Sequence, residues 1–165
     1  MRLIDPIVAE LDQEAQTTRR VLERVPEDKL TWKPHPKSMS LGQLALHLAT
    51  APGAVATIAS QDRVEAPSFQ QSEAKSRAEI LDAFTQSMAT AKDLLNKIDD
   101  VRAMATWTLT RNGKVLMTVP RLAMLRAILL NHSYHHRGQL TVYLRLLNIP
   151  VPSIYGPSAD ENPFG

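Results

Sequence analysis

Apolar residues recur at helical spacing in four stretches of the chain, and the first stretch follows Asp5-Pro6. An aspartate that caps a helix, followed by proline at the first helical position, is typical of a helix start. We therefore expect Asp5 to be the N-cap and the helix to end before Pro26. The positions of its inward stripe are Ile7, Leu11, Thr18, Val21 and Leu22.

A capping box predicts the second helix. Residues 40–43 read Ser-Leu-Gly-Gln, in which the serine and glutamine side chains each bond a backbone N–H group of the other residue. Met39 and Leu44 have the spacing of a hydrophobic staple around this start. The helix is expected to run to about Ser60, with a kink or an early break at Pro52.

A second capping box, residues 76–79 (Ser-Arg-Ala-Glu), predicts the third helix. Its apolar stripe consists of Ile80, Phe84, Met88, Leu95 and Ile98. Residues 61–75 are polar and contain one proline, so we expect them to form a long connection. The last helix is predicted from Pro120 to about Asn148, and the tail after it is expected to be irregular.

Residues 104–118 depart from the helical periodicity. Their two halves alternate in character around Asn112-Gly113, the strongest short signal for a β-hairpin. A lone hairpin is only marginally stable, so it must pack against the helices. Trp32 is expected to anchor the proline-rich connector 26–39 to the core. The pattern predicts an all-α fold over residues 1–165: a single-domain four-helix bundle with a long connection between helices 2 and 3 and a small β-hairpin before the last helix.

Composition narrows the possible chemistry. The 165 residues carry a formal net charge of +2, and lysine and arginine are mixed with carboxylates along the chain. This mixture gives no basic stripe for nucleic acid. The absence of cysteine excludes disulfides, thiolate metal ligands and a cysteine nucleophile. No apolar run approaches the ~18 residues of a membrane span and no signal peptide is evident, so we expect a cytoplasmic protein with no membrane partner.

Three histidines are the candidate metal ligands. On the last helix His132 and His136 lie about 40° apart, on the face that also carries Leu129 and Leu140. His47 falls on the apolar face of the second helix. Three buried imidazoles are costly if protonated and unpaired, and sharing one cation removes that cost. A single histidine on an apolar face is nevertheless more often a hydrogen-bonded core residue than a ligand.

The sequence leaves more than one role possible for the polar residues near these histidines. His135 could replace His136 in an i, i+3 pair, or it could lie at the rim of the pocket. Gln139 could orient a ligand or make an ordinary interhelical hydrogen bond. Tyr143 could offer its hydroxyl to the pocket or fill the core. Arg137 is expected in a surface salt bridge, and His35, between two prolines, on the surface.

Two segments carry a family resemblance. Residues 131–152 (NHSYHHRGQLTVYLRLLNIPVP) are similar to the closing helix of the DinB-like, or YfiT-like, metal-binding proteins. Residues 30–49 (LTWKPHPKSMSLGQLALHLA) resemble the tryptophan-containing loop and first histidine helix of that family. The resemblance implies a four-helix bundle that binds one divalent ion, zinc or nickel, through His47, His132 and His136. It also implies a homodimer.

Several activities follow from this resemblance. Characterised relatives include thiol S-transferases that use bacillithiol or mycothiol, and a mycothiol-dependent isomerase. Three protein nitrogens would leave a coordination position open, as in catalytic zinc sites. We expect a small-molecule substrate, with a low-molecular-weight thiol presented to an electrophile as the favoured chemistry. The alternatives are a metal-dependent hydrolase and a non-catalytic metal-binding, stress-associated protein.

A hydrolase usually needs a carboxylate as general base. No aspartate or glutamate falls on the histidine faces of the two helices. Glu10 or Glu14 of the first helix, or Asp160 or Glu161 of the tail, could supply one. The non-catalytic alternative predicts a sealed site, whereas an enzyme needs a cleft of about several hundred Å³ beside the metal.

Overall fold

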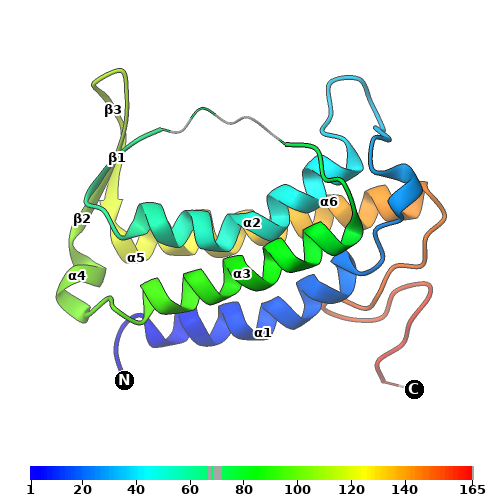
Figure 1. The fold of residues 1–165 in the computed structure, drawn as a ribbon. Helices are drawn as coiled ribbons and strands as arrows, with labels where there is room; N and C mark the ends of the chain where they lie inside the picture. Colours follow the sequence, from blue (N-terminus) through cyan, green and yellow to red (C-terminus); the bar gives the residue numbers. More distant parts are fainter. Residues whose placement is uncertain (67, 69–71, 165) are drawn as a thin grey trace.

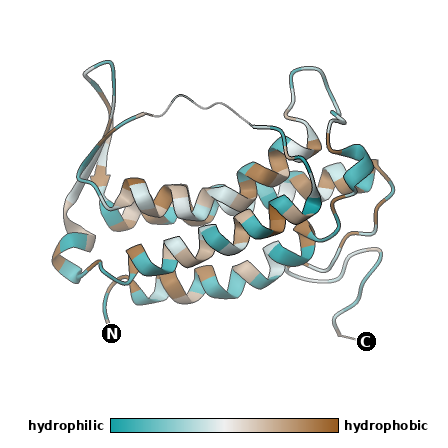
Figure 2. Cartoon of the chain, in the orientation of Figure 1, coloured by the Kyte–Doolittle hydropathy of each residue, from teal (hydrophilic) through white to brown (hydrophobic). Residues whose placement is uncertain are grey.

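Long helices dominate the structure, a computed structural model that describes residues 1–66, 68 and 72–164. Helices α1 (Asp5–Leu22), α2 (Leu41–Ala59), α3 (Arg77–Leu95) and α6 (His132–Leu146) run side by side (Figure 1). Apolar and hydrophilic positions alternate around these helices, so each has an apolar side (Figure 2). The predicted stripes of the first and third helices are buried in the common core. The expected, mostly helical architecture is therefore confirmed.

Both predicted capping serines lie at the starts of their helices. Ser40 accepts a hydrogen bond from the backbone N–H of Gln43, and the Gln43 side chain accepts from that of Ser40. Ser76 likewise caps α3 through the N–H of Glu79. The prediction for the first helix was wrong by one residue. Its N-cap is Ile4, and the Asp5 carboxylate accepts from the N–H of Arg2 because Asp5 already lies in the first turn.

Pro52 does not end α2, which continues to Ala59. A proline inside a helix removes one backbone donor and disturbs the turn before it. Here Ser87 of α3 repairs the disturbance. Its hydroxyl accepts from the N–H of Gly53 at 2.8 Å and donates to the carbonyl of Thr50 at 3.0 Å. A side chain at Gly53 would contact the Ser87 backbone within 3.1 Å, so the glycine permits this close approach.

A three-stranded sheet lies at one end of the helices, where only a hairpin was expected. Strands β2 (Thr106–Arg111) and β3 (Lys114–Pro120) form the predicted hairpin, with positive φ at Asn112 and Gly113. Strand β1 (Arg63–Glu65) pairs in parallel with β2. A long connection was predicted over residues 61–75, but this strand within it was not, because three alternating residues are too few to reveal a strand in sequence.

The last helix is continuous but not uniform. It begins as α5 (Arg121–Met124), passes through a π-helical segment, η2 (Leu125–Asn131), and continues as α6 from His132. Short helices η1 (Glu27–Lys29) and α4 (Asp100–Met104) complete the fold and were not predicted. The described part of the tail after α6 contains no helix or strand, as expected.

The expectation that no stretch approaches a membrane span was wrong for helix α2, which has the length and apolar composition of one, with a mean hydropathy of 1.2. In the structure 61% of that stretch is buried among the other elements. This is what a core helix requires, so the helix gives no independent case for a membrane.

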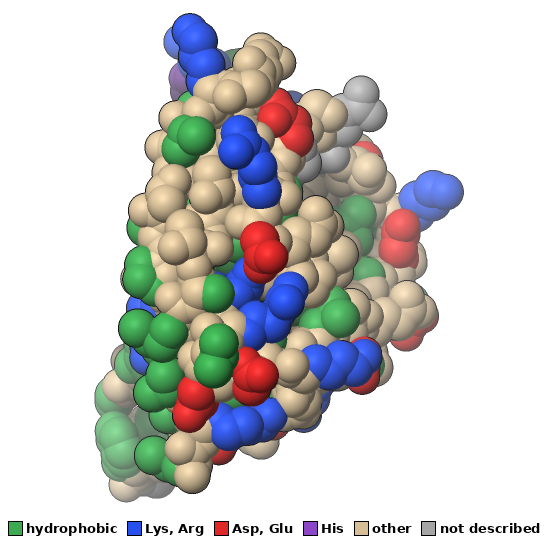
Figure 3. Space-filling view, turned by 90° about the vertical axis from the view of Figure 1, so that its left-hand side faces the viewer, with side chains coloured by type: hydrophobic (Ala, Val, Ile, Leu, Met, Phe, Trp, Pro, Cys, Tyr) green, Lys and Arg blue, Asp and Glu red, His purple; other side chains and the backbone are tan. Residues whose placement is uncertain are grey.

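Exposed apolar side chains gather beside the sheet and the N-terminus (Figure 3). Leu3, Met104 and Leu122 line a shallow apolar groove of about 470 Å³ there. Lysine, arginine and carboxylate side chains are intermixed over the rest of this face, with no basic stripe in view (Figure 3).

Arg121 joins the sheet to the helices. Its side chain is fully buried and donates to the carbonyl groups of Ala59, Gln61 and Arg102, and it pairs with Asp62. The carbonyls at the end of α2 lack partners within the helix, so the guanidinium completes that end.

We predict that Arg121→Met lowers the free energy of unfolding by about 3 kcal/mol, because it leaves several buried carbonyls without a donor. Denaturant unfolding would measure the loss. Arg111→Met, at an exposed position of the hairpin, is the control and should change stability by less than about 0.5 kcal/mol. Equal stability of the two variants would contradict the role given to Arg121.

Candidate metal centre

Three histidine rings converge between α2 and α6. The Nε2 atoms of His132 and His136 lie 2.9 Å apart, and those of His47 and His132 lie 3.4 Å apart. The three ring centroids are separated by 4.3–5.1 Å. His136 is buried and the other two are half-buried. The structure thus brings together the three residues that the sequence singled out, from positions 85 residues apart in the chain.

These nitrogens fit the ligand set of one ion. Two ligands of a tetrahedral zinc with Zn–N bonds of about 2.0–2.1 Å lie roughly 3.3 Å apart. The observed separations bracket that value, so only small side-chain shifts are needed. The Nδ1 atom of His132 is buried and has no hydrogen-bond partner in the described part of the chain. The polar contacts of the His132 ring are those of its Nε2 atom with the Nε2 atoms of His47 and His136.

The local environment keeps the three imidazoles neutral. Burial lowers the pKa of His47 and that of His136. Burial, with the charges that His136 and His47 would carry, lowers the pKa of His132 to about 4. At neutral pH each ring therefore keeps a lone pair, which is the form that binds a metal ion. A cation at this place would meet three nitrogen donors and no competing proton.

Gln139 fixes the orientation of one ring. Its side-chain carbonyl accepts a hydrogen bond from Nδ1 of His136 at 2.7 Å. With the proton held on Nδ1, the lone pair of His136 is on Nε2, which faces the other two histidines. The sequence left this choice open between an orienting contact and an ordinary interhelical bond, and Gln139 makes the orienting contact.

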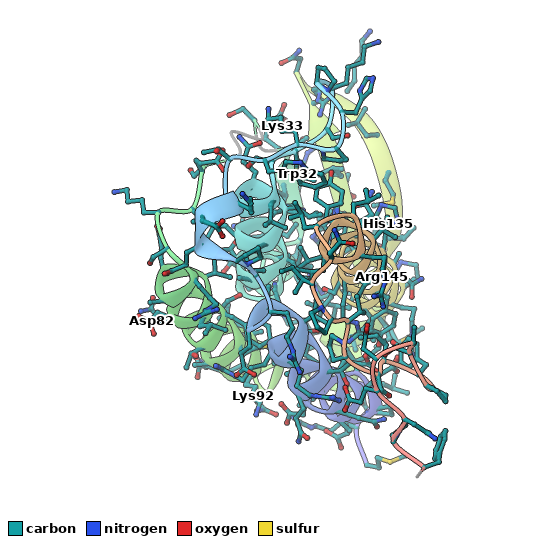
Figure 4. The ribbon with its side chains drawn as sticks, turned by 90° about the vertical axis from the view of Figure 1, so that its right-hand side faces the viewer. Trp32, Lys33, Asp82, Lys92, His135 and Arg145 are labelled. Atoms are coloured by element: carbon teal, nitrogen blue, oxygen red, sulfur yellow. The ribbon has the colours of Figure 1, made fainter. Side chains whose placement is uncertain are left out.

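The two other pocket candidates lie outside the cluster. His135 is exposed, and its ring lies 5.0 Å from that of His136, centroid to centroid. Figure 4 shows His135 on the outer side of α6. Tyr143 is half-buried, and its hydroxyl donates to the carbonyl of Met39 at 3.3 Å. Its ring meets Trp32 edge-on, 5.8 Å between centroids, so Tyr143 holds the connector against α6.

A groove of about 450 Å³ lies beside Gln139, the residue that is hydrogen-bonded to His136. Gln139 and Tyr143 of α6 line one side, and Gln43, one helical turn before His47, lines another. The connector supplies the rest through Lys33, Pro36, Lys37, Ser38 and Met39. Gln139 thus both contacts His136 and borders the groove, although none of the three histidines is among the described residues that line it.

The position predicted for Arg137 was wrong. Arg137 is 2% exposed and forms an ion pair with Glu14 at 2.6 Å. It also donates to Thr18 at 3.2 Å and to the hydroxyl of Tyr155. Tyr155 belongs to the tail, which folds back and covers a position that an isolated helix would expose. No helical projection of α6 alone could reveal this burial.

The carboxylates considered for a general base are already engaged. Glu10 accepts from Arg126 at 2.7 Å and from the hydroxyl of Tyr134 at 2.6 Å. Glu14 accepts from Tyr155 at 2.9 Å and pairs with Arg137. No carboxylate of the described residues joins the histidines in a cluster with metal-ligand spacing.

Two tail carboxylates hold the tail in place instead of covering the histidines. Asp160 pairs with Arg145 and accepts from the N–H of Val151 at 2.8 Å. Glu161 pairs with Arg20 and accepts from the N–H of Ser153 at 2.9 Å. The sequence showed no role for this segment. The structure shows that it ties α6 to α1.

We predict that Gln139→Ala weakens zinc affinity about tenfold, because the His136 ring loses the partner that fixes its proton on Nδ1. Competition with a chromophoric chelator would measure the affinity. His135→Ala is the matched control, since it removes a neighbouring exposed imidazole of the same helix. Unchanged affinity in Gln139→Ala, or an equal loss in both variants, would contradict the orienting role.

We also predict that acid releases the tail. The Arg145 contact lowers the pKa of Asp160, and the N–H of Ser153 lowers that of Glu161. A lowered carboxylate pKa stabilises the docked tail above the ordinary value and loses that effect as pH falls through the folded value. The amide NMR signals of Val151 and Ser153 should therefore stay unchanged down to about pH 4 and shift below it.

The double variant Asp160→Asn, Glu161→Gln should show the shifted signals already at neutral pH. Signals that shift near pH 6 in the unmodified protein would instead indicate that a histidine controls the docking.

Comparison with known proteins shows the family of this chain. The DinB family model matches residues 4–162. Over 167 aligned residues the chain is 26% identical to the uncharacterized protein YrdA of Bacillus subtilis (strain 168), with 96% of this chain and 91% of YrdA covered.

Two solved structures share the fold. A DinB-like protein from Bacillus cereus ATCC 10987 has a TM-score of 0.72 at 22% identity, covering 90% of this chain and 95% of that one. A DinB-like protein from Bacillus subtilis, YjoA, has a TM-score of 0.66 at 18% identity, covering 88% and 96%. With the family model matching almost the whole chain, this protein belongs to the DinB family.

Proposed function

We propose that this protein is a metal-dependent transferase that presents a low-molecular-weight thiol to a small electrophilic substrate. The observation that carries the proposal is the cluster of three neutral imidazoles, with an open groove on the other side of Gln139, the hydrogen-bond partner of His136. Nitrogen-only donors suit zinc or nickel, and three of them leave room for an exogenous ligand. Such an ion lowers the pKa of a bound thiol or water and thereby supplies a nucleophile at neutral pH.

The protein's own residues would position the reactants. His47, His132 and His136 hold the ion, and Gln139 keeps the His136 proton away from it. The groove offers the space for a substrate of ordinary size. In the reaction the thiol gives up its proton and its sulfur bonds to an electrophilic carbon. The leaving group departs with the electron pair of the broken bond, and the thiol proton passes to it or to water.

Hydrolysis is the second chemistry open to such an ion, and the structure favours it less. A hydrolytic site would need a general base beside the nucleophilic water. Glu10, Glu14, Asp160 and Glu161 are all held in ion pairs with arginines. A purely metal-storing role is opposed by the groove, because such a site needs no adjacent space. The homodimer that the sequence resemblance implies also stays a proposal.

Cobalt substitution tests the transferase. We expect about one cobalt per chain, bound in the unmodified protein and lost in His132→Ala, with His135→Ala as the variant that keeps it. Adding cysteine, glutathione or 2-mercaptoethanol to the cobalt protein should change its visible absorption, because sulfur replaces an oxygen ligand. Binding of cobalt with no spectral response to any thiol would overturn the thiol chemistry and leave the metal site. No cobalt binding would overturn both.

A further inference from the structure

The groove beside Gln139 has a definite chemical character. Its lining contains two lysines, Lys33 and Lys37, and no carboxylate. Neither lysine forms an ion pair within the part of the chain that the structure describes. On the face drawn in Figure 3 both signs of charge are mixed, whereas this groove is lined by two cations and no carboxylate.

The loop that carries these lysines is held in shape. Its two ends are joined by a hydrogen bond from the N–H of Leu41 to the carbonyl of Trp32, at 2.9 Å. Within the loop, Nδ1 of His35 accepts from the N–H of Lys37 at 3.1 Å, and its carbonyl accepts from the N–H of Ser38 at 2.9 Å. His35 is exposed as predicted, but it also shapes the turn between the two lysines.

The same loop is anchored to α6 by the Trp32–Tyr143 ring contact. Figure 4 shows Trp32 and Lys33 over the ends of α2 and α6, on the same side of the molecule as His135. A ligand in the groove would therefore not have to order the loop, which reduces the entropic cost of binding.

Neutral donors complete the groove. Ser38 contributes a hydroxyl group and Gln43 a carboxamide. The Tyr143 hydroxyl also lines the groove, but its proton is donated to the carbonyl of Met39. The carboxamide oxygen of Gln139 is bound to His136, so its NH₂ group remains as a donor for a ligand. Lysine ammonium groups with amide and hydroxyl donors around them form a common setting for carboxylate or phosphate oxygens.

We infer that this groove binds the anionic end of a small organic substrate and so directs its other end to the histidine cluster. The inference rests on the proposed function for the identity of the reacting centre, and it adds the chemical class of the substrate: a small acid that carries carboxylate or phosphate. Because the lysines are exposed, each contributes a modest, salt-dependent part of the affinity.

Binding of simple anions tests the groove without any thiol chemistry. Glutarate is titrated into the ¹⁵N-labelled chain as purified, with glutaramide as the uncharged analogue and inorganic phosphate as the second anion. We expect glutarate or phosphate, and not glutaramide, to shift the side-chain amide signals of Gln43 and Gln139. The anion that binds more tightly assigns carboxylate or phosphate as the recognised group.

Variants decide whether the lysines are responsible. The double variant Lys33→Ala, Lys37→Ala should lose about fivefold in anion affinity. Lys114→Ala, at the exposed end of the hairpin, is the matched control and should bind as the unmodified protein does. No shift with either anion, equal shifts with glutaramide, or full affinity in the double variant would each overturn the inference.

The outcome separates this inference from the proposed transferase. The anion shifts should persist in His132→Ala, because the groove does not use the imidazoles. Lysine-dependent anion binding with no thiol response of the cobalt protein would support the anion-binding role of the groove and overturn the proposed transferase. A thiol response of the cobalt protein with no anion binding would support the transferase and overturn the anion-binding role of the groove. If both hold, the cobalt protein should bind 3-mercaptopropionate more tightly than 2-mercaptoethanol, and the double variant should lose that preference.

Discussion

Imidazole rings placed within contact distance of one another cannot all be positively charged, and the contacts that position these rings must satisfy that constraint. Burial lowers the pKa of each ring, and His132, in the middle, is affected most. The Nε2 atoms of the three rings converge, and a metal ion bound between them would replace their close mutual contacts with coordination bonds. The capped start of α2, the Ser87 contact at Gly53 and the carboxamide of Gln139 all fix the helices or rings that carry the three nitrogens.

A second buried polar system lies on the other side of α6. Arg137 is surrounded by Glu14, Thr18 and the rings of Tyr134 and Tyr155. A buried guanidinium is stable only when ion-pair and hydrogen-bond partners are close to it. One of these partners, Tyr155, belongs to the tail. Neighbouring residues of α6 thus face opposite demands, since His136 must remain uncharged while Arg137 stays charged. The helix separates the two by pointing them at different neighbours.

Periodicity and capping signals were sufficient to predict the long helices, the hairpin and the histidine faces, because these depend on local spacing. The features that sequence reasoning missed depend on distant partners. Strand β1 forms because it pairs with the edge of β2. Arg137 is covered in part by Tyr155 of the tail. His47 contacts His132 only because α2 packs against α6. The positions of the histidines along each helix could suggest this pair but could not show that the two helices face each other. The groove was missed for the same reason, although the two lysines of the connector were a visible signal.

The π-helical segment has a consequence for how this site could vary. A π turn holds an extra residue compared with an α turn, so it sets the rotation of everything that follows it about the helix axis. In this chain the segment ends at Asn131, directly before the first histidine of α6. Loss of a single residue there would convert the π turn into an α turn, which spans nearly the same rotation with one residue fewer. The apolar stripe upstream and the histidine pair downstream would then keep their orientations. The last helix can therefore change its length at this segment without turning the imidazoles away from His47.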